Sequence, residues 1–409
     1  MILDKATLQA IESSLTIVND KVTTLNFVKD ATQNINKELK ELSFHHSKQE
    51  VVFDIGASDT SKFIDNIQLA SRVNGKNLTI GGDGRNNQIF LALWAARNEI
   101  QGLDPLEVVI YCIEEPEAHL HPHQQRKLAE YLYKVLKSQV IITTHSPQIT
   151  SEFSPDSIIR LYEDELSSVA ANCGCSQILS DVILGFGHRM NIISAEAFFA
   201  NTVFLVEGAS EVLFYKALAA KIGVDLDRSN VSILMVDGVG FEPYAKVLTE
   251  LGIYWIMRTD NDVFKIPRKD AYRYAGVQRA VKMCKGYCKL DTETDKIFVI
   301  NEPLLRDFKV PIPKVNLNAA KVIETSLAAY DVYLASVDLE TDIFHSDIKD
   351  DIKAFFKECD NTCTDDEYLS LMKERKATFM YNFLIENQDC LSKLADSQLA
   401  LPLKACVRG

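Results

Sequence analysis

Short apolar runs alternate with amphipathic segments along most of the chain. In the first part, the apolar run at 51–55 predicts a strand, and the runs at 108–113 and at the start of 139–147 predict buried strands. Residues 121–137 have apolar positions at helical spacing after a polar start, which predicts a helix. The pattern predicts one or two long helices in 1–45. Residues 77–100 are expected to form the end of a strand, a glycine turn and a helix, and residues 157–164 are expected to close this part of the chain.

A second series of strands and helices follows a bridging stretch that carries a short helix at 194–201. Its expected strands are 202–208, 231–238 and 254–262, and its expected helices are 209–223 and 241–252. Strands that alternate with helices indicate a mostly parallel sheet, with ligands at the carboxyl ends of the strands. The chain from about residue 304 has a largely helical pattern, so the fold class is α/β with a helical C-terminal region.

Composition and charge limit the class of protein. The 409 residues are 47% hydrophobic and 25% charged, which is ordinary globular composition and enough for two or three domains. No apolar run reaches the roughly 18–20 residues that span a bilayer, and the acidic, amphipathic N-terminus is unlike a signal peptide. The nine scattered cysteines lack the spacing of a zinc site and indicate free thiols in a reducing compartment, so we expect a cytoplasmic protein without membrane contact.

A net charge of −13 excludes a protein that binds DNA over its whole surface, so any contact with nucleic acid must be local. One local basic segment exists, FKIPRKDAYRYAGVQRAVKMCKGYCK at 264–289. Its first part carries four candidate DNA-binding residues, namely Lys265, Arg268, Lys269 and Arg273. Taken alone, the segment is better explained as the solvated face of a helix.

The first candidate site follows the strand in VVIYCIEEPEAHLHPH, residues 108–123. Glu114 could hold Mg²⁺ through water and Glu115 could orient an attacking water. His145, after the neighbouring strand, could sense a γ-phosphate. Upstream, TIGGDGRNNQ places a glycine turn before a helix, and its backbone N–H groups suit a phosphate. The turn consists of Gly81, Gly82, Asp83 and Gly84. His119, His121 and His123 are better explained by local packing and capping than by metal ligation.

These motifs in this order resemble the ABC-type ATPases: signature loop, Walker B acid with a catalytic glutamate, then a switch histidine. The wording EEPEAHLHP followed by TTHSPQ is closest to the OLD (overcoming lysogenization defect) family of nucleases and its relatives, the Gabija-type defence nucleases. The resemblance makes Glu114 the Mg²⁺-side acid, Glu115 the catalytic glutamate and Gly81 to Gly84 part of the signature loop. Thr79-Ile80 stands where the family usually has Leu-Ser.

The phosphate loop of such an ATPase, G-x-x-x-x-G-K-[ST], is absent from the sequence. Without its lysine and its Mg²⁺-binding hydroxyl, a complete ATP site cannot form in cis. A truncated or late start, a separate chain that supplies the missing half, and a degenerate relative that keeps only the nuclease all explain this. We expect no ATP hydrolysis by this chain alone, and ATP binding only if the missing half is supplied. The signature loop could still act in trans, in a homodimer or with a partner chain.

The second candidate site is a set of acids that follow neighbouring strands. Glu207 ends the strand in TVFLVEGASEVLFY, Glu211 starts the next helix, and Asp237, Asp260 and Asp262 follow the next two strands. Carboxylates gathered at one sheet edge repel one another unless cations lie between them, and oxygen ligands suit Mg²⁺ or Mn²⁺. Two such ions could hydrolyse a phosphodiester. Two of the acids also have a purely structural explanation: Glu211 could be an acid favoured in the first turn of a helix, and Asp237 could be a turn residue.

The run NIISAEAFFANTVFLVEGASEVLFY (191–215) resembles the Toprim domain of the OLD family. The resemblance implies metal-site roles for the five acids and adds a downstream acid and a lysine that stabilises the transition state. The best matches are Glu340 in SVDLETDI and Lys376 in KERKATFMYNF, with Asp338 and Lys373 as alternatives. Lys376 could equally be a solvated helix lysine.

The sequence therefore predicts a Toprim endonuclease of the OLD family that binds DNA, uses two Mg²⁺ or Mn²⁺ ions and acts in anti-phage or anti-plasmid defence. The expected domains are a partial ABC-type ATPase (1–165), connecting helices (166–200), a Toprim core (201–303) and a helical region that completes it (304–409). A rival hypothesis is a non-catalytic partner that donates its signature loop to a complete ATPase. A topoisomerase or primase is less well supported, because no zinc module and no evident tyrosine nucleophile domain accompany the acids.

Overall fold

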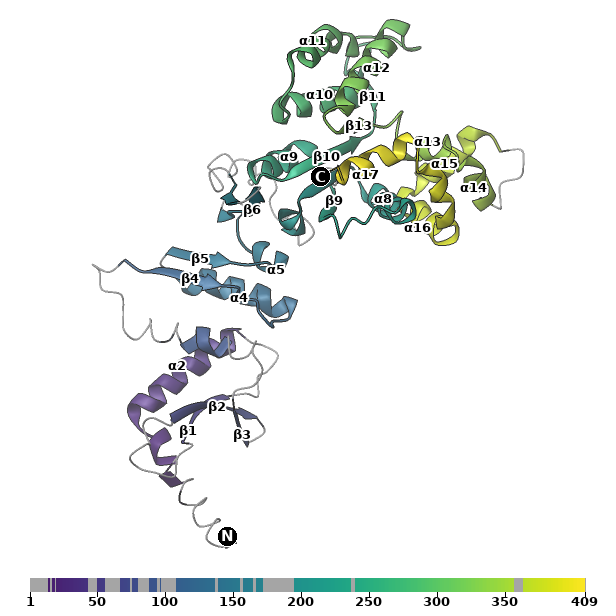
Figure 1. Ribbon diagram of the computed structural model, residues 1–409. Helices are drawn as coiled ribbons and strands as arrows, with labels where there is room; N and C mark the ends of the chain where they lie inside the picture. The colour runs from purple at the N-terminus through teal and green to yellow at the C-terminus, as the bar shows by residue number, and fades with distance from the viewer. Residues whose placement is uncertain are drawn as a thin grey trace. The chain divides into compact units, whose positions relative to one another are not determined.

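A computed structural model describes most of the chain as two compact units, Met1–Phe153 and Ser154–Gly409 (Figure 1). The described residues are 14, 17–18, 20–42, 50–55, 67–73, 76–79, 88–93, 96, 108–136, 139–154, 157–164, 167–171, 195–236, 240–356 and 363–408. Among the helices that the structure describes, none combines the length and the apolar character that crossing a membrane requires.

The first unit begins with a helix and an antiparallel sheet. The sheet has the order β1-β2-β3, with β1 at Glu50–Ile55, β2 at Ile67–Val73 and β3 at Lys76–Thr79. Helix α2 (Asn26–Leu42) lies against β1, and the Asn36 side-chain amide exchanges two 2.8 Å hydrogen bonds with the backbone of Val51. The long helix and the strand at 51–55 expected from the sequence are confirmed.

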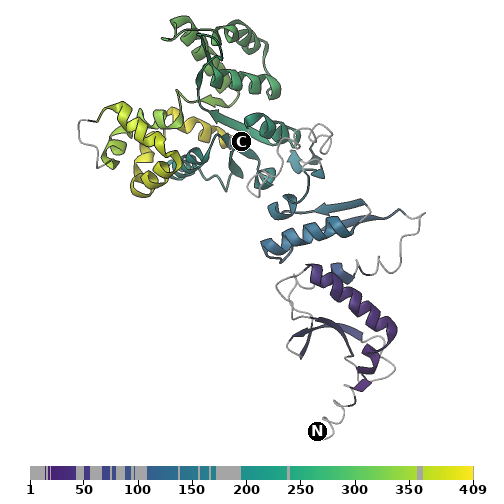
Figure 2. The same cartoon turned by 180° about the vertical axis from the view of Figure 1, so that it is seen from behind.

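A parallel strand pair forms the second part of this unit. Strands β4 (Ile110–Glu114) and β5 (Gln139–Thr143) pair in parallel, and helix α4 (Pro122–Val135) connects them. Figures 1 and 2 show α4 running along this pair. The Tyr131 hydroxyl donates a 2.7 Å hydrogen bond to Glu38, which ties α4 to α2. The two strands thus end side by side, with Glu114 and Thr143 in register.

The second unit is built on a four-stranded parallel sheet of order β13-β10-β8-β9. Its strands are β8 (Thr202–Val206), β9 (Val231–Met235), β10 (Tyr254–Thr259) and β13 (Val332–Leu334). Both faces of β8, one of the two central strands, are buried. Val203 and Leu205 belong to one apolar cluster, and Phe204 and Val206 belong to another. A parallel strand covered on both faces reads as the continuous apolar run seen in the sequence.

Helices cover the two faces of this sheet. One cluster contains residues of α9 (Phe241–Glu250), α10 (Ala275–Tyr287), α11 (Thr292–Asn301) and α12 (Lys314–Ala328). The other contains residues of α8 and the C-terminal helices, which Figure 1 draws in yellow-green to yellow. These helices are α8 (Ala209–Ile222), α13 (Leu339–Phe344), α14 (Lys349–Phe355), α15 (Asp365–Glu374), α16 (Lys376–Asn387) and α17 (Leu401–Cys406). The α/β class with a parallel sheet and a helical C-terminal region is confirmed.

Two short segments complete the comparison with the sequence expectation. In the helix expected at 194–201, the described residues 195–199 are helical and end in the 3₁₀ helix η4 (Ala197–Phe199), and strand β8 begins at Thr202 as expected. Strand β6 (Leu161–Asp164) pairs with β7 (Ser167–Ala170) in the second unit rather than closing the first. The Arg160 guanidinium donates hydrogen bonds to the carbonyls of Ala200 and Gly252, which fixes this segment to the second unit.

Candidate functional site

Acidic residues gather at the carboxyl edge of the parallel sheet. Glu207 directly follows β8, Asp260 directly follows β10, and Asp262 lies two residues further on. Glu340 comes from α13, which follows the neighbouring strand β13, and Glu211 comes from the first turn of α8. Asp237, the expected acid after β9, lies outside the described residues.

Glu207 is held in one orientation by three donors on the same carboxylate oxygen. Its Oε1 accepts hydrogen bonds from the Thr259 hydroxyl at 2.6 Å, from the Asp260 backbone N–H at 2.9 Å and from the Arg279 guanidinium at 2.6 Å. Two of these donors, one side-chain hydroxyl and one backbone N–H, belong to the end of β10, so the carboxylate that follows β8 is fixed by the end of the neighbouring strand. This arrangement follows from the parallel pairing of β8 with β10.

Asp260 is a buried carboxylate that lacks a partner for one oxygen. The residue is 8% exposed, and its Oδ1 has no hydrogen bond to the described part of the chain. Burial, and secondly the nearby Glu207 carboxylate, raise the pKa of Asp260 to about 8. The positive charge of Lys376, 4.0 Å from Oδ2, opposes this shift in the pKa. An ionised Asp260 at neutral pH therefore calls for a further cation.

The start of α10 packs directly against the Asp260–Asp262 turn. The Asp262 carbonyl accepts hydrogen bonds from the N–H groups of Ala275, at 2.7 Å, and Gly276, at 3.3 Å. A Cβ at Gly276 would lie 2.1 Å from the Asp260 carbonyl oxygen, so only glycine fits this close approach. The same helix carries Arg279, whose guanidinium bonds the Asp262 carboxylate at 3.1 Å.

Glu340 and Lys376 form the other side of the site. Glu340 is fully buried, and its Oε1 accepts a 2.9 Å hydrogen bond from the Ser210 hydroxyl. The Lys376 ammonium lies 3.0 Å from Glu340 Oε2. Burial alone would lower the pKa of Lys376, but the negative charges of Glu340 and Asp260 outweigh burial and raise it. Burial raises the pKa of Glu211, with a smaller contribution from Glu340.

The alternative pair from the sequence lies in a different environment. Asp338 is the N-cap of α13, accepting a 2.9 Å hydrogen bond from the Thr341 N–H, and it also pairs with Lys373 at 2.8 Å. Asp338 and Lys373 thus pair with one another, whereas Lys376 lies near both Glu340 and Asp260, the acid that follows β10.

The donor set of this edge suits a divalent cation. It consists of carboxylate oxygens, which are the ligands that Mg²⁺ and Mn²⁺ prefer, and the buried Asp260 Oδ1 is left for such an ion. The side chains of the described residues do not by themselves form a closed group of three potential metal ligands. Glu207, Glu211, Asp260, Asp262 and Glu340, together with the undescribed Asp237, are the residues that could hold it.

Sequence reasoning missed the residues that position these acids. Arg279 was expected only as one charge of a solvated basic segment, yet it is turned toward Glu207 and Asp262. Thr259 and Ser210, which donate to Glu207 and Glu340, had no assigned role. Gly276 was the sequence feature that could have indicated the role of Arg279. A glycine early in a helix marks a close approach to other backbone, and Arg279 lies one helical turn after Gly276.

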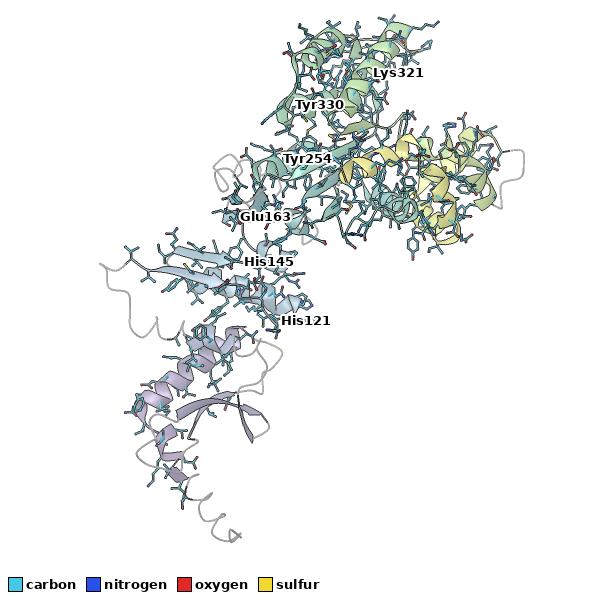
Figure 3. All side chains as sticks on the ribbon, in the orientation of Figure 1. His121, His145, Glu163, Tyr254, Lys321 and Tyr330 are labelled. Atoms are coloured by element: carbon cyan, nitrogen blue, oxygen red, sulfur yellow. The ribbon has the colours of Figure 1, made fainter. Side chains whose placement is uncertain are left out.

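The first unit places the other candidate acids at the end of β4. Glu115 has a positive φ of 40°, so the chain turns sharply after the strand, and its N–H bonds the Thr143 carbonyl at 2.9 Å. His145 follows β5 (Figure 3), and its Nε2 lies 3.5 Å from Glu115 Oε1. The side chains of His145 and Glu115 are both exposed, and Glu114 is the last residue of β4. Gly81, Gly82, Asp83 and Gly84 lie outside the described residues.

Glu117 supports this loop and was not singled out in the sequence. Its Oε1 accepts hydrogen bonds from the Thr144 hydroxyl at 2.6 Å and from the His145 N–H at 2.8 Å. The histidines that follow make local contacts: the Arg126 guanidinium lies 2.7 Å from His123 Nδ1, and the His121 N–H bonds the Gln124 side chain at the start of α4. The third acid of EEPE was the sequence signal for the role of Glu117.

The basic segment divides into two parts with different roles. Its first part is a hairpin of β11 (Val263–Lys265) and β12 (Tyr272–Tyr274), on which Lys265, Arg268, Lys269 and Arg273 are exposed. Its second part is α10, where Lys282 pairs with Glu242 and Lys285 with Glu302. Tyr274 is buried in the core. The segment is therefore not one continuous helix face.

Comparisons with known proteins agree with this division of the chain. Residues 198–262 match the family model described as "Overcoming lysogenization defect protein-like, TOPRIM domain", and residues 3–150 match the model described as "AAA ATPase domain". The first match contains Glu207, Glu211, Asp260 and Asp262, and the second contains Glu114, Glu115 and His145.

Two curated relatives share sequence with most or half of the chain. The endonuclease GajA of Bacillus cereus is 27% identical over 370 residues, which cover 87% of this chain and 60% of the relative. The OLD nuclease of Thermus scotoductus is 27% identical over 231 residues, which cover 52% of this chain and 42% of the relative. The chain thus spans less than two thirds of the length of either relative.

One similar solved structure is the C-terminal region of the Burkholderia pseudomallei OLD protein, at 17% identity. The match covers 51% of this chain and 98% of that chain with a TM-score of 0.33. The family models supply the assignment: residues 198–262 are similar to a Toprim domain of the OLD-like type, residues 3–150 are similar to an ATPase domain of the AAA class, and a helical C-terminal region follows.

Proposed function

We propose that the chain is a metal-dependent DNA endonuclease of the OLD family. The observation that carries the proposal is the gathering of Glu207, Asp260, Asp262 and Glu340 around Lys376 and Arg279 at one sheet edge, with the buried Asp260 Oδ1 left for a cation. A non-catalytic partner subunit is the weaker candidate, because burying several carboxylates together is unfavourable unless they hold a ligand. The similarity to the endonuclease GajA and the OLD nuclease also favours cleavage.

We assign each residue of the site a role in cleavage. The ions would be held by six carboxylates: Glu207, Glu211, Asp237, Asp260, Asp262 and Glu340. Two bound divalent ions would supply an activated water and charge stabilisation on the leaving oxygen. The half-exposed Lys376 ammonium, fixed by Glu340, would bind a non-bridging phosphate oxygen and stabilise the charge that develops there. We assign cleavage to residues 201–303 together with 304–409, within the second unit, and nucleotide contacts to the first unit, which ends at Phe153.

The test is conversion of supercoiled plasmid to relaxed or linear forms by the purified full chain. With Mg²⁺ or Mn²⁺ we expect conversion without ATP, and none after chelation with EDTA, because the proposed mechanism relies on bound ions to activate the water and to stabilise the leaving oxygen. Conversion that persists in EDTA would contradict the metal requirement. We place this activity in anti-phage or anti-plasmid defence, so expression of the chain should lower plaque counts or plasmid retention, and unchanged counts would contradict that setting.

We propose that the β11–β12 hairpin contacts the DNA backbone beside the metal site. Its exposed cations follow the Asp260–Asp262 turn directly. Among the described residues, Lys265 pairs with the exposed Asp270 at 3.9 Å and Lys269 with the exposed Asp307 at 3.2 Å, so both ammonium groups stay accessible to solvent. Replacing Lys265, Arg268 and Lys269 by glutamate should weaken DNA binding at least tenfold. It should also flatten the salt dependence of binding, since each lost phosphate contact reduces the slope of log affinity against log salt concentration by about one. Fluorescence anisotropy at several salt concentrations measures both quantities; an unchanged slope would contradict the assignment.

We propose that this chain alone does not hydrolyse ATP. Glu114, Glu115 and His145 are arranged at the strand ends, but the sequence has no G-x-x-x-x-G-K-[ST] segment to bind the phosphates. A partner chain that carries such a segment would complete the site, whereas a second copy of this chain could supply only the signature loop in trans. Phosphate release from ATP should therefore stay at background for the pure chain, and turnover that Glu115→Gln abolishes would refute the proposal.

A further inference from the structure

Arg279 connects two of the acids that come from different strands. Its guanidinium donates to Glu207 Oε1 through Nη1 at 2.6 Å and to Asp262 Oδ2 through Nη2 at 3.1 Å. The same Nη1 lies 2.5 Å from the Thr259 hydroxyl, which itself donates to Glu207. The guanidinium is planar and presents its donors in a fixed fork, so it fixes the orientation of both carboxylates at once.

Each carboxylate uses only one of its oxygens in these contacts. Among the described residues, the three hydrogen bonds to the Glu207 side chain converge on Oε1, and the contact to the Asp262 side chain is on Oδ2. Glu207 Oε2 and Asp262 Oδ1 receive no hydrogen bond from this part of the chain. A cation can therefore bind the second oxygen of each acid while Arg279 stays in place.

Helix α10 holds Arg279 in position from behind. Val277, Ala280 and Val281 are buried in the core cluster on this face of the sheet, and the Gly276 N–H bonds the Asp262 carbonyl. The helix is thus fixed to the turn that carries the acids, and about two thirds of the Arg279 side chain is buried. An arginine held this way keeps its geometry whether or not a ligand is present.

We propose that Arg279 is a positioning residue that orients Glu207 and Asp262 for divalent-cation binding and thereby sets the affinity of the site for the metal. This inference rests on the proposed nuclease function and assigns a role that the sequence did not indicate. Outer groups that hydrogen-bond ligating carboxylates change metal affinity by about 10- to 100-fold when they are removed.

The sign of the effect separates positioning from simple charge. If Arg279 acted only through its charge, removing it would tighten the binding of a cation, because like charges repel. If Arg279 orients the carboxylates, removing it weakens binding despite the more negative site. Replacement by lysine keeps the charge but removes the fork, so a positioning role predicts weaker binding for lysine too.

The experiment is a calorimetric titration of the metal-free full chain with Mn²⁺, using Arg279→Gln, Arg279→Lys and the control Lys282→Gln. Lys282 lies on the same helix and pairs with the exposed Glu242, so its replacement makes the same change in charge away from the site. We expect Mn²⁺ binding about 10- to 100-fold weaker for Arg279→Gln, severalfold weaker for Arg279→Lys, and within twofold of wild type for Lys282→Gln. Melting temperatures of the metal-free proteins should agree closely.

Equal or tighter Mn²⁺ binding by Arg279→Gln than by wild type would overturn the inference and leave the nuclease proposal intact. Absence of Mn²⁺ binding by the wild-type chain would overturn both. Raising the Mn²⁺ concentration should restore plasmid cleavage by Arg279→Gln, since the defect lies in affinity. Failure of that rescue at saturating Mn²⁺ would also contradict a role in positioning the metal ligands.

Discussion

Replacing Lys376 by methionine is expected to reduce plasmid cleavage by about a hundred- to a thousandfold, the usual effect of removing one donor that stabilises transition-state charge. The ammonium lies 3.0 Å from Glu340 and 4.0 Å from Asp260, and these acids raise its pKa. Lys376 is therefore protonated at neutral pH, and its side chain is exposed enough to reach a phosphate. Initial rates of nicking, measured at saturating Mn²⁺, check this prediction.

Lys373 provides the matched control for this variant. It stands three residues earlier and pairs with Asp338 at 2.8 Å, away from the acids of the strand ends. Lys373→Met should keep more than half of the cleavage rate, and both variants should still bind Mn²⁺. Equal losses in the two variants would show that the general charge of this region, and not the position of Lys376, supports cleavage.

Replacing Gly276 by alanine is expected to damage both the stability and the activity of the second unit. The new Cβ would lie 2.1 Å from the Asp260 carbonyl oxygen and 2.7 Å from the Asn261 Cα, so backbone must move. Overpacking of this kind costs about 1–3 kcal/mol, and a shift of about 1 Å in a catalytic group lowers rates about a hundredfold. Chemical denaturation and nicking rates measure the two effects.

Gly286 lies on the same helix and makes the comparison specific. A Cβ at Gly286 would meet nothing within 4 Å, and alanine is about 1 kcal/mol better than glycine inside a helix. Gly286→Ala should therefore be neutral or stabilising and should cleave DNA at the wild-type rate. A Gly276→Ala protein with wild-type stability and activity would show that α10 can move away from the Asp260–Asp262 turn without consequence.

The parallel sheet could be predicted from the sequence because its strands are buried on both faces. Apolar runs such as 202–206 stand out when no polar face interrupts them, and each is followed by a carboxylate. Since parallel strands end at the same edge, the meeting of Glu207 and Asp260 followed from the pattern alone. Glu340 and Lys376 needed the resemblance, because nothing local distinguishes them from Asp338 and Lys373.

The groups that orient the acids could not be predicted, because their positions depend on tertiary packing. Arg279 is one of several cations in a basic run, and the buried face of α10 decides that it turns inward while Lys282 pairs outward. Thr259 is likewise one polar residue at a strand end until pairing with β8 places it beside Glu207. Contacts between residues far apart in the chain carry no periodic signal in the sequence.

Cleavage of supercoiled plasmid by the purified chain, with Mg²⁺ or Mn²⁺ and no ATP, tests the central claim most directly when wild type is compared with Glu207→Ala and Glu242→Ala. Glu207 is fixed by three donors at the sheet edge, whereas Glu242 is an exposed helix acid paired with Lys282. The account predicts metal-dependent cleavage by wild type and Glu242→Ala, and none by Glu207→Ala. Well-folded wild-type protein that leaves the plasmid intact, or a Glu207→Ala protein that cuts as fast as wild type, would contradict it.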